Sequence, residues 1–146
     1  MSTVYATFVV DDRFLGLPVG RVREVLRAQP LTPVPLAHEH ISGLLNLRGQ
    51  IVTAIDLRAR LHLAPREAGE PSAHVVVTAD DAPVSLVVDR LGDVIAVDEA
   101  TFEATPDTVD TGSRPLIKGA FKLDDALLLD LNLEETLNLT TDLERA

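Results

Sequence analysis

The chain of 146 residues contains no cysteine and no tryptophan. Without cysteine it can form no disulfide, no thiolate nucleophile and no zinc–sulfur site. It also lacks long apolar runs: the longest, such as residues 126–129, fall far short of the roughly 20 residues that span a bilayer. Residues 1–12 contain neither the basic nor the apolar region of a signal peptide. These absences predict a soluble, cytoplasmic protein with no direct membrane insertion.

Positive charge is also scarce, because 13 Lys and Arg stand against 23 Asp and Glu, a net charge of −10. Residues 1–73 hold 8 basic and 7 acidic residues, a net of +1, whereas residues 74–146 hold 5 and 16, a net of −11. Such a chain disfavours contacts with phosphate backbones, and it has no basic stripe with interleaved aromatic residues. We therefore expect no nucleic-acid partner, and we interpret most acidic residues as solvated turns and loops.

Short segments rich in β-forming residues follow one another along the chain, separated by turn residues. Three hairpins are predicted: 3–10 with 14–19 around Asp11-Asp12-Arg13, 44–48 with 51–56 around Gly49-Gln50, and 116–123 with 126–131 around Asp124-Asp125. Further strands are expected at 74–79, 83–88 and 93–97. Many short strands and few helices predict a mainly β protein, either a barrel or a sandwich.

The segments between the strands predict loops. Residues 19–26 fit either a helical turn or a strand. Prolines at 30, 33 and 35 predict an extended edge or a loop, because proline cannot sit in a central strand. Residues 64–73 and the Thr/Asp/Pro-rich residues 98–115 have the composition of loops.

Two positions predict short helices. Asp56 follows an apolar strand and is a candidate N-cap for a helical turn. Asn132 and Glu135 have the spacing of a capping box, which predicts a short C-terminal helix starting near Leu133.

The sequence also contains an internal repeat. A shift of 69 residues aligns Asp11, Asp12, Leu17, Val19, Arg21 and Val25 with Asp80, Asp81, Leu86, Val88, Arg90 and Val94. Residues 41–57 match 117–131, with Ile41, Gly43 and Leu47 against Ile117, Gly119 and Leu123, and with Asp56-Leu57 against Asp130-Leu131 after a two-residue deletion at the turn. A true repeat predicts two similar small β-barrels related by a pseudo-twofold axis, and coincidence in β-patterned sequence is the alternative.

The repeat separates residues 43–58 by role. Asp56 recurs as Asp130 in this alignment, which favours a structural role such as capping. Asn46 is replaced by Lys122, and Arg48 has no counterpart because the second copy lacks the Arg-Gly turn. A charge that the second copy does without is a candidate for recognition. The alternative is a solvated hairpin charge or a local salt bridge.

Catalytic and metal-binding interpretations have less support. His38 and His40 invite a metal site, but His62 and His74 lack the spacing of a motif, so we interpret the pair as solvated loop histidines. The Asp-Asp pairs lie at predicted turns, where aspartate is favoured for backbone reasons. No serine lies in a nucleophile motif with a matching His/Asp order. We expect no enzyme and no catalytic, cofactor-binding or metal-binding residues.

GLLNLRGQIVTAIDLR, residues 43–58, resembles the signature of the CheW family, the coupling proteins of bacterial chemosensory arrays. FLGLPVGRVREVL (14–26) resembles the family's N-terminal hairpin with its following segment, and VSLVVDRLGDVIAV (84–97) resembles its second-half core. The chain departs from many members at Thr53, where they have a proline. The resemblance implies a single domain, residues 1–146, made of two interlocked SH3-like five-stranded β-barrels with short helical segments.

The resemblance further implies a non-catalytic adaptor without a cofactor. Members of the family bind the cytoplasmic tips of chemoreceptors, the methyl-accepting proteins, and the regulatory domain of the histidine kinase CheA. We expect this chain to bridge the two in membrane-associated receptor arrays. A related alternative is a CheW-like scaffold of a non-flagellar pathway with a motility, developmental or second-messenger output. A remote alternative is a small β-barrel metal-dependent hydrolase.

Matching to the family gives the expected partner-binding residues, which are Val22, Glu24, Asn46, Leu47, Arg48, Gly49, Leu91 and Val94. The three apolar residues Val22, Leu91 and Val94 match a groove for a receptor helix, placed where the two barrels meet. Arg48 is expected to pair with Glu24 and to orient the turn that follows Asn46, because a guanidinium–carboxylate fork is geometrically specific.

Overall fold

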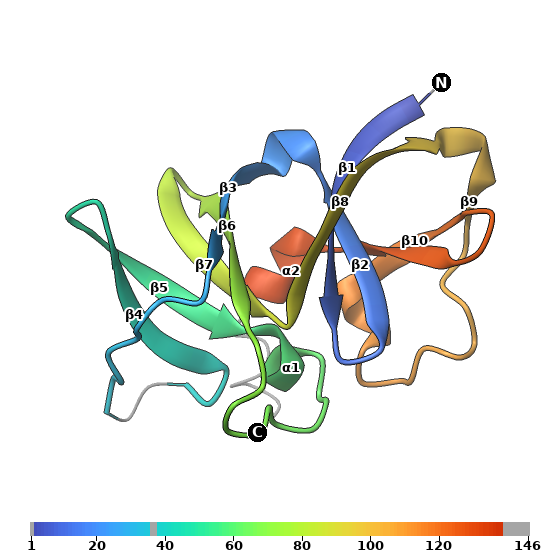
Figure 1. Ribbon diagram of the computed structural model, residues 1–146. Coiled ribbons are helices and arrows are strands. Elements are labelled where there is room, and N and C mark those ends of the chain that lie inside the picture. Colours follow the sequence, from blue (N-terminus) through green and yellow to red (C-terminus); the bar gives the residue numbers. More distant parts are fainter. Residues whose placement is uncertain (1, 36–37, 139–146) are drawn as a thin grey trace.

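The computed structural model describes residues 2–35 and 38–138. Eleven strands within these ranges form two curved sheets, which we call the first and second barrels (Figure 1). The first barrel has the strand order β8-β1-β2-β11-β10-β9, and its strands are β1 (Ser2–Val10), β2 (Arg13–Pro18), β8 (Arg90–Asp98), β9 (Phe102–Glu103), β10 (Ile117–Lys122) and β11 (Leu127–Leu131). The second barrel has the order β3-β6-β7-β5-β4, and its strands are β3 (Val22–Arg27), β4 (Ile41–Leu47), β5 (Gln50–Asp56), β6 (Ala73–Ala79) and β7 (Ala82–Val88).

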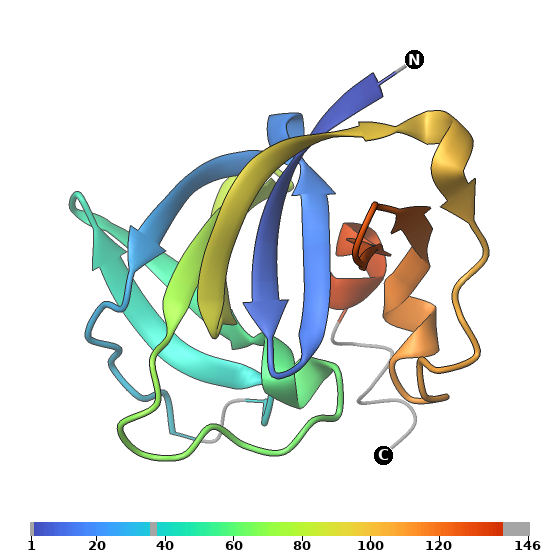
Figure 2. The same cartoon turned by 45° about the vertical axis from the view of Figure 1, so that its right-hand side comes forward.

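The two barrels exchange one strand each. β3 follows β2 in the chain but pairs with β6 of the second barrel, whereas β8 follows β7 but pairs with β1 of the first. Figures 1 and 2 show β8 crossing from one sheet to the other through the middle of the molecule. The predicted interlocked pair of barrels is therefore confirmed. The first barrel carries one strand more than predicted, the two-residue β9.

Strand register supports the internal repeat. Leu91 pairs with Phe8 in the first barrel, as Val22 pairs with Val77 in the second. The parallel pairs agree as well: Leu129 lies opposite Leu15, and Thr53 lies opposite Val84. The offset is 69 residues for the strands β1 to β3 and 76 for the hairpin β4–β5. Both copies therefore build the same pairing from different side chains.

The predicted two-residue deletion in the second copy is wrong. Leu131 pairs with Ile117 as Ile55 pairs with Ile41, and the Leu123 amide donates to the Ala126 carbonyl to close a two-residue turn. The two hairpins thus have equal length, and a gap-free offset of 76 residues relates them. The sequence alignment had placed the gap to match one Asp-Leu pair with another.

Two residue equivalences change as a result. Asp56 corresponds to Asn132, not to Asp130, and both residues cap a helix through their side chains: Asp56 accepts from the Arg58 amide and Asn132 from the Glu135 amide. Asp130 corresponds to Ala54 and is buried in the first barrel. Arg48 does have a counterpart, which is Asp124 in the turn between β10 and β11.

The predicted caps place the two helices correctly. α1 (Leu57–Arg60) follows Asp56, and α2 (Leu133–Leu137) follows Asn132. Residues 19–26 contain both alternatives, the helical turn η1 (Val19–Arg21) and then β3. The 98–115 segment is more ordered than predicted, since it holds η2 (Glu99–Thr101), β9 and η3 (Arg114–Leu116). In the described part of the chain no helix is long and apolar enough to cross a membrane.

The largest apolar cluster lies between the barrels and draws on both. Phe8 and Leu15 enter it from the first barrel, and Val77 and Leu86 enter it from the second. A smaller cluster around Phe121 fills the first barrel, and another around Leu45 and Val52 fills the second. Burial of apolar area on this shared seam stabilises the packing of one barrel against the other.

Candidate functional site

The turn between β4 and β5 holds the residues that the resemblance singles out. Arg48 and Gly49 both have positive φ, 52° and 84°, as the two central residues of a type I′ hairpin turn require. The Asn46 carboxamide oxygen accepts from the Gly49 amide at 2.8 Å and braces the turn. Arginine is rare in this backbone region, so the side chain at position 48 has to be explained by its contacts.

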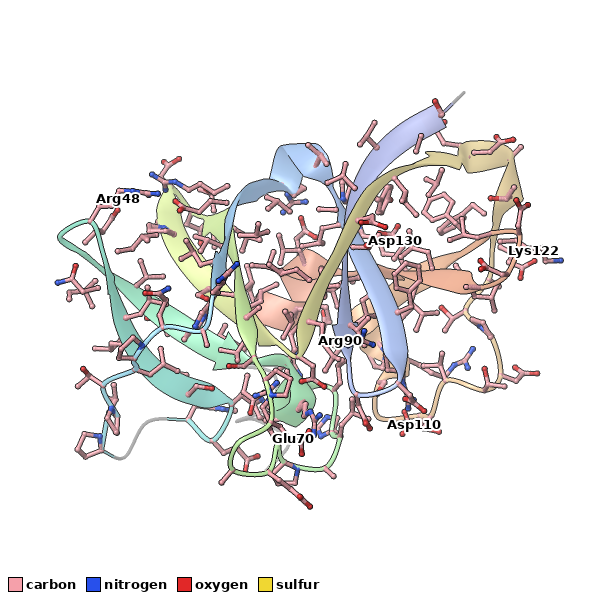
Figure 3. The ribbon with its side chains drawn as sticks, in the orientation of Figure 1. Arg48, Glu70, Arg90, Asp110, Lys122 and Asp130 are labelled. Carbon is pink, nitrogen blue, oxygen red and sulfur yellow. The ribbon has the colours of Figure 1, made fainter. Side chains whose placement is uncertain are left out.

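Arg48 makes the predicted ion pair with Glu24. Its Nη1 donates to Glu24 Oε2 at 2.7 Å and its Nη2 donates to Oε1 at 2.8 Å, a bidentate fork. The Arg48 side chain is 72% exposed and points away from the hairpin tip (Figure 3). Hydrogen bonds from Arg48 hold the pKa of Glu24 below its ordinary value. The carboxylate is therefore charged at neutral pH.

This pair joins the two ends of the second sheet. β3 and β4 are the outermost strands in the order β3-β6-β7-β5-β4, and Glu24 lies on β3 while Arg48 follows β4. The first barrel has no such pair, because the positions equivalent to Glu24 and Arg48 are Asp93 and Asp124. Two carboxylates repel each other. An ion pair between the two outermost strands is thus a feature of the second barrel and not of the first.

The predicted groove residues lie on the two exchanged strands. Val22 is half-buried at the start of β3 and packs against the shared apolar cluster. Leu91 and Val94 are on β8 and are 38% and 63% exposed. Val22 and Leu91 occupy equivalent positions, as predicted, because each pairs with an equivalent residue of the neighbouring strand. Leu47, by contrast, is half-buried against the cluster inside the second barrel.

Sequence reasoning missed one exposed apolar residue beside the Arg48 turn. Ile51 is 60% exposed and pairs with Asn46 across the hairpin. Its exposure follows from the strand alternation, since Val52 is buried and neighbouring residues point to opposite faces. The polar residue at position 46 was the signal that could have found it, because cross-strand partners share a face. Ile51 therefore places an exposed apolar side chain next to the turn that carries Arg48.

The prediction of solvated loop histidines is wrong for His40. His40 is 3% exposed, its carbonyl accepts from the Asp56 amide, and its ring centroid lies 4.6 Å from that of His38 and 6.0 Å from that of His62. His62, which follows α1, is thus one of the rings that lie near His40. In residues 2–35 and 38–138 no group of three His, Cys, Asp or Glu side chains could hold a metal ion.

Each barrel also buries a polar pair, and one member of each pair, Tyr5 in the first barrel and His74 in the second, occupies an equivalent position. In the first, burial and then the neighbouring Asp130 raise the pKa of Tyr5 to about 12, and burial raises the pKa of Asp130. In the second, His74 is 2% exposed and its Nδ1 lies 2.8 Å from Ser85 Oγ. Burial, then the charge of Arg66, lowers the pKa of His74. These pairs are inside the barrels and are not available to a partner.

The described surface therefore presents exposed apolar residues on an exchanged strand and an ion-paired hairpin turn, on a framework of two interlocked barrels. These features define a protein of two interlocked barrels that share one apolar seam. The chain matches the family model described as CheW-like domain over residues 5–140. It belongs to the CheW-like family, and by this membership it is a scaffold or adaptor of chemotaxis.

Individual relatives agree with this assignment. The chemotaxis protein CheW of Bacillus subtilis is 31% identical over 121 residues, which cover 83% of this chain and 78% of the relative. The chemotaxis protein CheW of Treponema pallidum is 26% identical over 133 residues, covering 88% and 78%. The crystal structure of the scaffolding protein TtCheW from Thermoanaerobacter tengcongensis matches with a TM-score of 0.79 at 30% identity, covering 90% of each chain.

Proposed function

We propose that this protein couples the cytoplasmic tips of chemoreceptors to the regulatory domain of a CheA-type histidine kinase, as one non-catalytic domain recruited to membrane-associated arrays. The observation that carries the proposal is the presence of recognition features on both barrels: exposed Leu91 and Val94 on the first, and the Arg48–Glu24 fork on the second. A coupler needs two such surfaces, because it holds two partners together.

The receptor contact is assigned to Val22, Leu91 and Val94. A receptor tip is a helical hairpin, and a helix docks through an apolar stripe onto apolar residues of its partner. Leu91 and Val94 are three residues apart on β8 and both remain exposed. Val22 supplies the equivalent position from β3, so the helix would contact the two strands that join the barrels.

The contact with the second partner, the kinase, is assigned to the β4–β5 turn and the residues before it, which are Asn46, Leu47, Arg48 and Gly49. Glu24 holds Arg48 in place. The fork fixes the guanidinium in one orientation. The exposed Ile51 lies across the hairpin from Asn46, next to the turn. An exposed ion pair contributes little to stability. The presence of arginine at a turn position with positive φ is therefore better explained by an interface that the ion pair shapes.

The charges of the two barrels also support two different partners. Residues 22–88, which build the second barrel, hold 6 basic and 7 acidic residues, a net of −1. Residues 2–21 and 89–138, which build the first, hold 6 and 14, a net of −8. Electrostatic complementarity steers a surface towards partners of opposite charge, so the two barrels select for different surfaces.

Binding experiments with separated partners test the assignment. Val22→Glu and Leu91→Glu are expected to abolish binding to a receptor tip fragment, because they place an uncompensated carboxylate in an apolar contact. Val34→Glu is the matched control, since Val34 has the same 38% exposure as Leu91 but lies outside the proposed contacts. The folded state of each variant is checked by circular dichroism. Unchanged receptor binding in folded Leu91→Glu would show the groove assignment to be incorrect.

A further inference from the structure

Asp89 is the single residue between β7 and β8, where the chain passes from the second barrel to the first. It is 8% exposed. Its carboxylate accepts from Arg58 Nε at 3.0 Å and Nη2 at 2.6 Å, from Arg66 Nη2 at 2.5 Å, and from the Asp11 amide at 2.6 Å. Its own amide donates to the Val9 carbonyl at 2.9 Å. One side chain thus holds three separate segments at the crossing point.

The three segments are α1, the loop after it and the β1–β2 turn. Arg58 lies on α1 and also donates to Glu70 Oε2 at 3.1 Å, while Arg66 lies on the loop that leads to β6. In Figure 3, Glu70 lies at the foot of the molecule below Arg90, the first residue of β8. Burial alone would raise the pKa of Asp89, but the hydrogen bonds from Arg58, Arg66 and the Asp11 amide outweigh it and hold the pKa below its ordinary value.

The equivalent crossing from β2 to β3 is built differently. The residue equivalent to Asp89 is Gly20, and the residue equivalent to Arg58 is Glu134. Glu134 pairs with Arg21 at 2.9 Å, but the two side chains are 64% and 40% exposed. The same strand exchange therefore forms without a buried carboxylate. The fold alone does not require the Asp89 cluster, which we define as Asp89, Arg58 and Arg66.

We propose that Asp89 and Arg58 are positioning residues that fix the start of β8 and thereby present Leu91 and Val94 to the receptor helix. Leu91 is two residues from Asp89, so the anchored carboxylate sets where β8 leaves the crossing and which face it shows. The inference rests on the proposed function, because it assigns β8 a receptor contact. The new element is that a buried cluster fixes β8 on its side of the receptor contact, whereas β3 on the other side has no such cluster.

The test separates positioning from stability. Removing one partner of a buried ion pair leaves an uncompensated charge, whereas replacing both with apolar residues of similar size is often neutral. The variant that combines Arg58→Met, Arg66→Met and Asp89→Leu, and so replaces every charged member of the cluster, is therefore compared with wild type. The control is Arg21→Met with Glu134→Leu, which removes the exposed ion pair at the other crossing. Hydrogen exchange of the β8 amides, receptor-tip affinity and kinase affinity are measured on each.

The proposal predicts faster exchange at residues 91–95 and an about tenfold loss of receptor-tip affinity in the first variant, the scale of coupling through packed networks. The kinase affinity of the first variant is expected to stay unchanged. In the control variant, the hydrogen-exchange rates of the β8 amides are expected to match those of wild type. If the first variant has the same β8 hydrogen-exchange rates and the same receptor-tip affinity as wild type, the proposal is overturned. The cluster would then contribute to stability alone.

If the variant without the cluster fails to fold, Arg58→Lys is measured in its place, because it keeps the charge but loses the fork. An unchanged receptor affinity in Arg58→Lys would overturn the proposal. If wild-type protein does not bind the receptor tip, the proposed function fails. Hydrogen exchange of the β8 amides still tests whether Asp89 positions this strand, because that measurement needs no binding partner.

Discussion

Arg48 and Glu24 connect the two outermost strands of the second barrel through parallel hydrogen bonds of 2.7 and 2.8 Å. The pseudo-equivalent residues of the first barrel, Asp124 and Asp93, cannot form such a bond. The asymmetry matters because strand register is otherwise the same in the two copies. A feature present in one copy and absent from the other is not required by the fold that both share.

Arg48→Ala is therefore expected to abolish receptor–kinase coupling while it leaves the thermal unfolding midpoint close to that of wild type. The Arg48 side chain is 72% exposed and covers the Glu24 carboxylate from the solvent side, so water can solvate that carboxylate once the guanidinium is removed. Coupling is measured as receptor control of kinase autophosphorylation in a reconstituted mixture. The exchange Arg48→Glu with Glu24→Arg serves as the control, since it restores a pair of opposite charges. Intact coupling in Arg48→Ala would contradict the role of the turn.

Asp130→Asn is expected to stabilise the protein at neutral pH. Burial raises the pKa of Asp130 in the folded protein, so its stability contribution is lost as the pH rises through that pKa. Asparagine keeps an acceptor for the Tyr5 hydroxyl and carries no charge, and the equivalent Ala54 shows that the fold needs no carboxylate there. Denaturant unfolding at pH 7 and at about pH 3 measures the difference, which should shrink at the lower pH. A less stable variant at pH 7 would argue against this account.

His74 is expected to make the protein less stable in mild acid. Its pKa in the folded protein is lowered by burial and by Arg66, so its contribution is fully present above the unfolded value of about 6.5 and is lost as the pH falls through the folded pKa. The variant His74→Gln keeps groups that can hydrogen-bond Ser85 and should lose less stability between pH 8 and pH 5. Equal losses in both proteins would assign the acid sensitivity to other groups.

Gly43→Ala is expected to destabilise the protein by about 1–3 kcal/mol, the cost of a strained backbone residue. Gly43 has a φ of 151°, and an added Cβ would lie 2.7 Å from the Thr32 carbonyl oxygen. That contact would break the bridge in which Thr32 and Leu44 exchange hydrogen bonds. Gly20→Ala is the control, because nothing lies within 4 Å of its added Cβ. Denaturant unfolding that ranks the two variants equally would refute the strain argument.

Local sequence signals predicted most of the fold. The Asp-Asp turns, the strand alternation and the two helix caps each depend on neighbouring residues, and all are present in the structure. Strand exchange depends on non-local pairing, so it followed only from the family resemblance. The gap that wrongly aligned Asp56 with Asp130 has a similar cause. The alignment matched two Asp-Leu pairs, because the equal length of the two hairpins is known only from their strand pairing.

The site was harder to predict because its contacts span long distances in the chain. Arg48 and Glu24 are 24 residues apart, and Arg58 and Asp89 are 31 apart. The first pair came from the resemblance, and the second was missed because charged residues in a β-rich sequence usually remain at the surface. His40 was misjudged for the same reason, since it is buried and lies near His62, which follows the next hairpin in the chain. Burial of polar residues is a tertiary property.

Co-sedimentation of kinase with receptor-containing membranes tests the adaptor role most directly. CheA-type kinase is mixed with membranes that carry candidate receptors, with and without this protein, and with the Leu91→Glu variant as a control. The account predicts that the kinase moves to the membrane pellet only when wild-type protein is present, and that the protein pellets with it. Kinase that stays in the supernatant with wild-type protein, or that pellets equally well without it, would contradict the coupling role.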